Sequence, residues 1–106
     1  MEIEIKFDQH GRIVPHMNGG KITMNVSPFL IFLATAGMCS AVFVQAFMNQ
    51  RGISTDDVKI IQRMNYDYAT NQVKDIDIHV DLPDSFPEKY NTAIKRVVDQ
   101  CPVKQH

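Results

Sequence analysis

The stretch SPFLIFLATAGMCSAVFV, residues 27–44, decides the fold of this chain. It opens with Ser27 and Pro28, which are typical of a helix start. A serine hydroxyl caps the first free N–H groups, and proline loses no donor at the first helical position. No charged residue occurs between Ile22 and Gln50, so a helix here is apolar on nearly every side. Such a helix has to be surrounded by other apolar groups.

Arg51 and Gly52 predict the end of this helix. A cation is favourable near the last carbonyl groups, and glycine readily adopts the left-handed conformation that follows them. The predicted helix covers residues 28–51 and is about 36 Å long. A charge-free segment of this length is also a transmembrane candidate. Because polar residues dilute it and its flanks lack a basic cluster and an aromatic belt, we expect a buried central helix of a soluble domain and no membrane partner.

Composition limits the classes of function. The 106 residues fit a single domain, 1–106, and the net charge of −1 offers no basic surface for nucleic acid. Two cysteines without a signal peptide indicate a reducing cytoplasm, where thiols are more often inert, catalytic or redox-sensing than permanently bridged. None of the four histidines has another His or Cys at ligand spacing, so we expect no metal and no other cofactor.

Alternating apolar residues predict strands on both sides of the long helix. Three strands are expected before it and two after it, at residues 2–8, 12–16, 22–26, 58–68 and 75–82. Ser85 and Glu88 have the spacing of a capping box, which predicts a second, amphipathic helix that reaches Cys101 at its buried face. This order of elements predicts an α+β fold with antiparallel sheets around the long helix.

The length of the chain also predicts its assembly. A domain of this size has little apolar material to wrap a helix of about 36 Å on all sides. The short N-terminal strands also leave open edges that need partners. Both problems are solved if two chains intertwine, so we expect a homodimer with the two long helices near its centre.

The chain resembles the OsmC/Ohr family of small cytoplasmic proteins. The resemblance rests on SP at 27–28 with GMC at 37–39, on the helix end RG at 51–52, on the two-strand interval that follows, and on CPV at 101–103. It implies an OsmC-like fold, an intertwined dimer with active sites at the interface, and thiol peroxidase activity toward organic hydroperoxides. Family members usually continue into a last strand after this point, so the chain is expected to be a divergent or truncated member.

The resemblance also implies roles for individual residues. Cys39 corresponds to the peroxidatic cysteine, which attacks the peroxide. Cys101 corresponds to the resolving cysteine, which closes a disulfide that an external dithiol reductant then opens. Family members support the first thiolate with an arginine from the N-terminal strands and a glutamate just after the helix-start proline. Arg12 is the only arginine in the N-terminal strands, whereas Phe29 and Leu30 occupy the positions where the glutamate is expected.

The chemistry of Cys39 needs a thiolate. A residue near the middle of a helix gains little from the helix dipole, so a cation has to approach from elsewhere, and Arg12 of either subunit is the first candidate. Four apolar residues of this helix are expected to belong to the core: Phe29, Phe32, Met38 and Phe43. If a pocket reaches Cys39, the same residues are the candidates to line it. Apolar walls suit an alkyl or fatty-acid hydroperoxide.

Other interpretations of the same residues stay open. A non-catalytic dimer could bind a small apolar ligand in the same cleft, and the missing glutamate favours this alternative. A thiol redox sensor would use the same cysteine pair. Buried cysteines also behave as inert small apolar residues, and Arg12 also fits a solvated turn.

Overall fold

Five antiparallel strands form one sheet in the order β3-β2-β1-β4-β5. The computed structural model describes residues 1–23, 25 and 27–99. The strands are β1 (Glu2–Phe7), β2 (Ile13–Met17), β3 (Gly20–Lys21), β4 (Lys59–Asp67) and β5 (Gln72–Asp81). Strands β1 and β4 pair with Ile5 opposite Ile60, so the N-terminal strands and the β4–β5 hairpin share one sheet.

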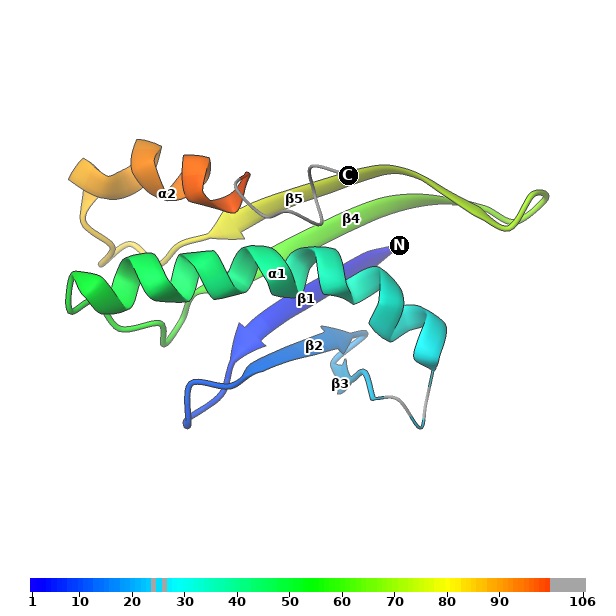
Figure 1. Ribbon diagram of the computed structural model, residues 1–106, viewed down its shortest axis with the longest axis horizontal. Coiled ribbons are helices and arrows are strands. Elements are labelled where there is room, and N and C mark those ends of the chain that lie inside the picture. The colour runs from blue at the N-terminus through cyan, green and yellow to red at the C-terminus, as the bar shows by residue number, and fades with distance from the viewer. Residues whose placement is uncertain (24, 26, 100–106) are drawn as a thin grey trace.

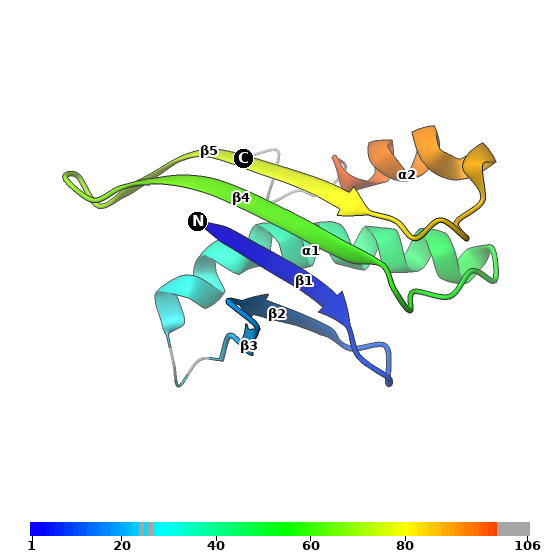
Figure 2. The ribbon, with the colours of Figure 1, turned by 180° about the vertical axis from the view of Figure 1, so that it is seen from behind.

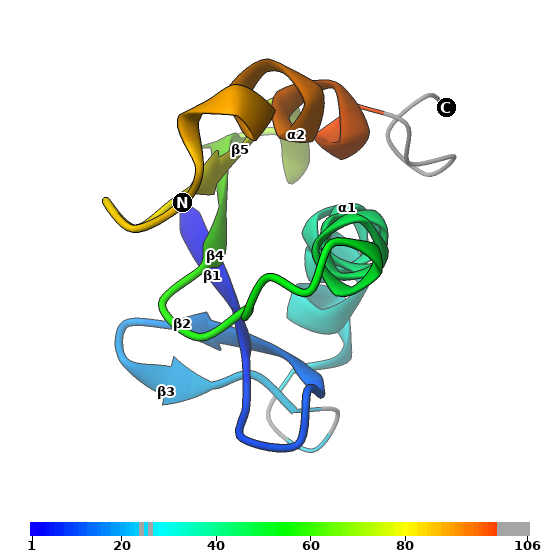
Figure 3. The same ribbon diagram turned by 90° about the vertical axis from the view of Figure 1, so that its left-hand side faces the viewer.

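Two helices cover one face of this sheet. They are α1 (Pro28–Gln50) and α2 (Asn91–Val98), and a 3₁₀ turn, η1 (Glu88–Tyr90), leads into α2. Figure 1 shows α1 lying across the strands with α2 beside it, and Figure 3 shows both helices on the same side of the sheet. The expected α+β fold with a long helix is therefore confirmed.

The ends of α1 are formed as the sequence predicts, to within one residue. The Ser27 hydroxyl accepts a hydrogen bond from the N–H of Leu30 at 3.2 Å. At the other end, Arg51 Nη1 donates to the carbonyl oxygen of Phe47 at 3.1 Å, and Gly52 has a φ of +68°. Local chemistry at both ends is sufficient to define this helix.

The core lies between the sheet and the two helices. Its fully enclosed side chains come from β1, α1, β4 and α2, and they include Ile3, Ile5, Val44, Ile60 and Ile94. Alternate residues of a strand point to one face, so the alternation in β1 and β4 delivers its isoleucines to this core. The amphipathic stripe predicted for the second helix is confirmed by the burial of Ile94 and Val98.

The other described elements leave one side of α1 uncovered. Phe29, Phe32 and Val42 are 48%, 70% and 53% exposed. The expectation that Phe29 and Phe32 are core residues is therefore wrong for a single chain. The reason is geometric: the sheet and α2 lie on one side of α1 only. Among the described residues, α1 is the one helix long and apolar enough to cross a membrane, which is weak evidence because core helices pass the same test.

The predicted start of the second helix is wrong. Ser85 does not cap it, because the chain first makes a turn in which the N–H of Phe86 donates to the carbonyl oxygen of Pro83 at 3.0 Å. The Phe86 side chain is buried by this turn, and Pro87 is still extended with a ψ of 123°. Burial of one aromatic ring thus overrides the capping signal. The helix ends at Val98, and Cys101 lies outside the described residues.

Two strand predictions also need correction. The third strand is limited to Gly20–Lys21 instead of 22–26, and residues 24 and 26 lie outside the described residues. In β5 the register shifts opposite Arg63 and Asn65, where Asp75 has a φ of +55°. An irregularity of this kind breaks the alternation of faces, which leaves Ile76 46% exposed instead of inward. Figures 1 and 2 show the β4–β5 hairpin projecting past the other strands.

Candidate functional site

Cys39 lies on the side of α1 that the sheet and α2 do not cover. It belongs to a stripe of residues three or four positions apart, which share one face of a helix: Phe32, Thr35, Cys39, Val42 and Ala46. All of them are exposed except Cys39, which is half-buried. We call these five residues the α1 stripe. It is apolar apart from the threonine hydroxyl, so Cys39 sits in an apolar strip of surface.

The sulfur of Cys39 is disulfide-bonded in the structure. Cys101 lies outside the described residues, but the end of α2 that precedes it lies beside the Cys39 turn. The hydroxyl of Ser40, the neighbour of Cys39, donates to the carbonyl oxygen of Val98 at 2.9 Å, and this hydrogen bond is buried. A buried carbonyl needs such a donor, so Ser40 holds the last residue of α2 against α1.

Arg12 lies in the turn between β1 and β2. The carboxylate of Asp8 organises this turn, since its Oδ1 accepts hydrogen bonds from the N–H groups of Arg12 and His10 at 2.8 Å each. These bonds, that of Arg12 first, lower the pKa of Asp8 because they stabilise its charged form. The backbone of Arg12 is thus fixed, while its side chain is exposed.

The same turn is attached to α1 beyond Cys39. Gln45 Nε2 donates to the carbonyl oxygen of Gly11 at 2.6 Å. Gln45 follows Cys39 by six residues, which is about 9 Å along the helix axis, and it lies on another side of the helix. Within one chain, the structure therefore places Arg12 beside a later turn of α1 than the turn that carries Cys39.

The four predicted pocket residues divide into two pairs. Phe29 and Phe32 are exposed near the start of α1, and the ring of Phe29 meets that of Tyr66 edge to face at 6.3 Å. Met38 and Phe43 are half-buried. Phe43 is one turn after Cys39 and therefore its neighbour on the helix surface. The first turn of α1 contains no acidic residue, so no carboxylate of that turn stands near this surface.

Gln62 of β4 is a polar residue that the sequence reasoning missed. It is fully buried and contacts the backbone of α1. Its Oε1 accepts from the N–H of Gly37 at 2.8 Å, and its Nε2 donates to the carbonyl oxygen of Leu33 at 2.7 Å. One sign was visible in the sequence: Gln62 occupies the buried parity of β4, between Ile60 and Met64.

Gly37 is required by this contact. A Cβ atom at position 37 would lie 2.7 Å from Gln62 Oε1 and 3.0 Å from Ile5 Cγ1. Glycine inside a helix costs about 1 kcal/mol relative to alanine. The cost is offset here because only a residue without a side chain lets α1 approach β1 and β4 this closely.

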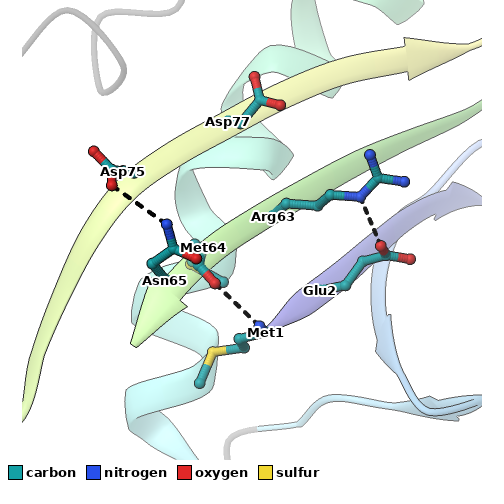
Figure 4. A pocket seen from close by; sticks show the side chains of 7 residues that line it. All are labelled: Met1, Glu2, Arg63, Met64, Asn65, Asp75 and Asp77. Atoms are coloured by element: carbon teal, nitrogen blue, oxygen red, sulfur yellow. Dashed lines mark hydrogen bonds and ion pairs between the residues drawn. The ribbon is translucent and has the colours of Figure 1, made fainter. Parts of the chain in front are cut away.

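A cavity of about 320 Å³ lies on the face of the sheet opposite α1 (Figure 4). Two contacts join groups of its lining: Arg63 Nε donates to Glu2 Oε2 at 2.8 Å, and Asn65 Nδ2 donates to Asp75 Oδ2 at 3.3 Å. The carboxylate of Asp77 also lines the cavity. The pair of Glu2 and Arg63 is exposed, and its hydrogen bond lowers the pKa of Glu2 and raises the pKa of Arg63. Both contacts join neighbouring strands: β1 to β4, and β4 to β5. Within the described part of the chain, no cluster of His, Cys, Asp and Glu could hold a metal ion.

Comparison with known proteins finds one family. The family model described as OsmC-like protein matches residues 19–106, which is more than half of the chain and includes both cysteines. No curated protein matches the chain, and no solved structure matches it.

Proposed function

Because the chain belongs to the OsmC-like protein family, we propose that it is a cysteine-dependent peroxidase that reduces organic hydroperoxides in the cytoplasm. The Cys39 thiolate attacks one peroxide oxygen, so an S–O bond forms and the O–O bond breaks. The alkoxide leaves, takes up a proton and becomes the alcohol. The product on the protein is a sulfenic acid at Cys39.

Cys101 completes the cycle in this proposal. Its thiol attacks the Cys39 sulfur, the S–S bond forms, and the sulfenic oxygen leaves as water. An external dithiol then reduces the disulfide by two exchange steps and is itself oxidised. The observation that carries the proposal is the disulfide at Cys39. The buried hydrogen bond from Ser40 to Val98 supports it, because it holds the chain just before Cys101 against the Cys39 turn.

The substrate surface is proposed to form between two copies of the chain. The α1 stripe and Phe29 leave an apolar surface that single soluble chains rarely expose, and a second copy would cover it. Phe29, Phe32, Met38 and Phe43 would then line the walls near Cys39. Arg12 of either subunit remains the proposed cation for the thiolate. Within one chain its turn is attached to α1 at Gln45, beyond Cys39, so its exposed side chain would have to reach the sulfur from there or from the second copy.

A second function is favoured by one observation. The first turn of α1 carries no carboxylate, so an arginine near Cys39 would lack the acidic partner that holds it in family members. Supporting groups of this kind hold reactive side chains to within about 0.5 Å. A dimer that binds a small apolar ligand without turnover is the alternative, and a redox sensor that uses the same disulfide is a further one.

Single-turnover oxidation separates these functions. Fully reduced protein is mixed with cumene hydroperoxide, and the products are identified by mass spectrometry. We expect wild type to form a disulfide at Cys39, Cys39→Ser to form none, and Cys101→Ser to stop at the sulfenic acid. If wild-type Cys39 ignores the peroxide and is alkylated like an ordinary thiol of pKa about 8.5, the peroxidase proposal fails and ligand binding replaces it.

A further inference from the structure

The amide of Gln62 binds the two backbone groups of one turn of α1. The carbonyl of Leu33 and the N–H of Gly37 are four residues apart, which is the pair that a regular α-helix joins directly. Gln62 reaches both at once, through Nε2 at 2.7 Å and Oε1 at 2.8 Å. A side chain that enters the hydrogen bonds of a helix turn is one of the known causes of a bend, and Gln62 bonds both groups of this turn while α1 stays α-helical throughout. Figures 1 and 2 show the first turns of α1 bending away from the axis of the rest.

The surroundings make this contact specific. In the sheet, Gln62 stands opposite Ile3 of β1 and Ile78 of β5, which are both buried and apolar. The second N–H of Nε2 donates to Met64 Sδ at 3.2 Å. Only one orientation of the amide satisfies these groups, because an N–H has to face the Leu33 carbonyl and an oxygen has to face the Gly37 N–H. A buried amide of this kind is costly unless every group is paired.

The contact lies between the aromatic start of α1 and the cysteine. Cys39 follows Gly37 by two residues, whereas Phe32 immediately precedes Leu33. The turn from Leu33 to Gly37 therefore divides the α1 stripe into two parts. Its direction decides how Phe32 stands relative to the Cys39 sulfur.

We propose that Gln62 is a positioning residue for the Cys39 thiol: by binding Leu33 and Gly37 it fixes the bend of α1 that directs the sulfur toward its disulfide and its substrate. This inference rests on the proposed function for the substrate, but its effect on the disulfide of Cys39 does not depend on peroxidase activity. Gly37 takes part in the same device, because any side chain there would displace the amide.

Gln62→Met separates positioning from stability. Methionine keeps the volume and removes the amide, so the Leu33 carbonyl and the Gly37 N–H keep only each other as partners, as in a regular helix. No buried group is left unpaired, and we expect the melting temperature to change little. Cys39 would nevertheless move with the straightened turn. A displacement of about 1 Å costs on the order of 100-fold in well-oriented reactions.

Two measurements test the inference on the full chain. The first is the equilibrium of the Cys39 disulfide with oxidised and reduced glutathione, which needs no peroxide. The second is the rate of Cys39 oxidation by cumene hydroperoxide. We expect Gln62→Met to shift the glutathione equilibrium by about tenfold or more toward the dithiol. The rate of Cys39 oxidation by the peroxide should fall by at least the same factor. Gln72→Met, at an exposed glutamine of β5, is the matched control and should change neither.

Gln62→Glu distinguishes a hydrogen-bonding role of Gln62 from a packing role, because only the former makes the effect of the substitution depend on pH. A protonated glutamic acid has one donor and one acceptor, as this site requires, whereas the ionised form has acceptors only. Burial raises the pKa of such a carboxyl group. The test quantity is the ratio of the glutathione equilibrium constant of this variant to that of wild type, measured at each pH. This ratio should approach one as the pH falls and depart from one as the pH rises.

The outcomes are distinct. If Gln62→Met keeps the wild-type glutathione equilibrium, or if the ratio for Gln62→Glu is constant with pH, Gln62 is a packing residue and the inference is wrong. If the glutathione equilibrium shifts while wild type ignores peroxide, the positioning role stands and the peroxidase proposal fails instead.

Discussion

Gly37→Ala is the sharpest test of how α1 packs on the sheet. In an open helix this change stabilises, because alanine has the higher helix propensity by about 1 kcal/mol. Here the new Cβ atom would lie 2.7 Å from Gln62 Oε1 and 3.0 Å from Ile5 Cγ1. Overpacking of this kind costs about 1–3 kcal/mol, and weakening the buried bond from the Gly37 N–H to Gln62 costs about 1 kcal/mol more.

The balance predicts that Gly37→Ala lowers the free energy of unfolding by about 2 kcal/mol. Urea unfolding measures this value, with the cysteines reduced and at one fixed protein concentration, since any association shifts the midpoint. The double variant with Gln62→Ala is the control. Removing the amide relieves the closer contact, so Gly37→Ala should cost at least about 1 kcal/mol less in that background. A Gly37→Ala protein as stable as wild type would refute the close approach of α1 to β4.

Three further predictions concern the α1 stripe, the contact between α1 and α2, and the stability of the fold at low pH. Val42→Glu places a charge on the α1 stripe, so sedimentation velocity should show loss of the proposed dimer; an unchanged mass would remove the stripe from the interface. Ser40→Ala leaves the buried carbonyl of Val98 without its donor, so the free energy of unfolding should fall by about 1–3 kcal/mol, and peroxide-driven disulfide formation should slow. The pKa of Asp8 is lowered, chiefly by the hydrogen bond from the N–H of Arg12. The ionised carboxylate therefore adds to the free energy of unfolding at neutral pH, and this stabilisation is lost as the pH falls below 3.8, the ordinary pKa of an aspartate. The stability difference between wild type and Asp8→Asn should accordingly shrink from pH 7 to pH 3, and a constant difference would contradict the role of that carboxylate.

The candidate site was predicted only in part. The position of Cys39 in a long apolar helix follows from the order of residues, and so does the missing carboxylate in the first turn. The place of Arg12 does not, because it depends on the contact between Gly11 and Gln45, which are 34 positions apart. Gln62 was missed for the same reason: alternation in β4 marks it as inward, but its partners are backbone groups of another element.

What the sequence by itself determined is local. Serine and proline at 27–28 and glycine at 52 define the ends of α1, because capping and backbone freedom depend on neighbouring residues alone. Alternation defines β1, β4 and the inward face of the sheet. The tertiary structure decided the features that depend on distant contacts. It buries Phe86 and so removes the expected cap at Ser85. It places the sheet and α2 on one side of α1 only. It also brings β4 close enough for the amide of Gln62 to hydrogen-bond to the backbone of α1. These outcomes depend on which surfaces compete for the same apolar volume and on which buried polar groups must find partners, and neither competition is written in a single stretch of chain.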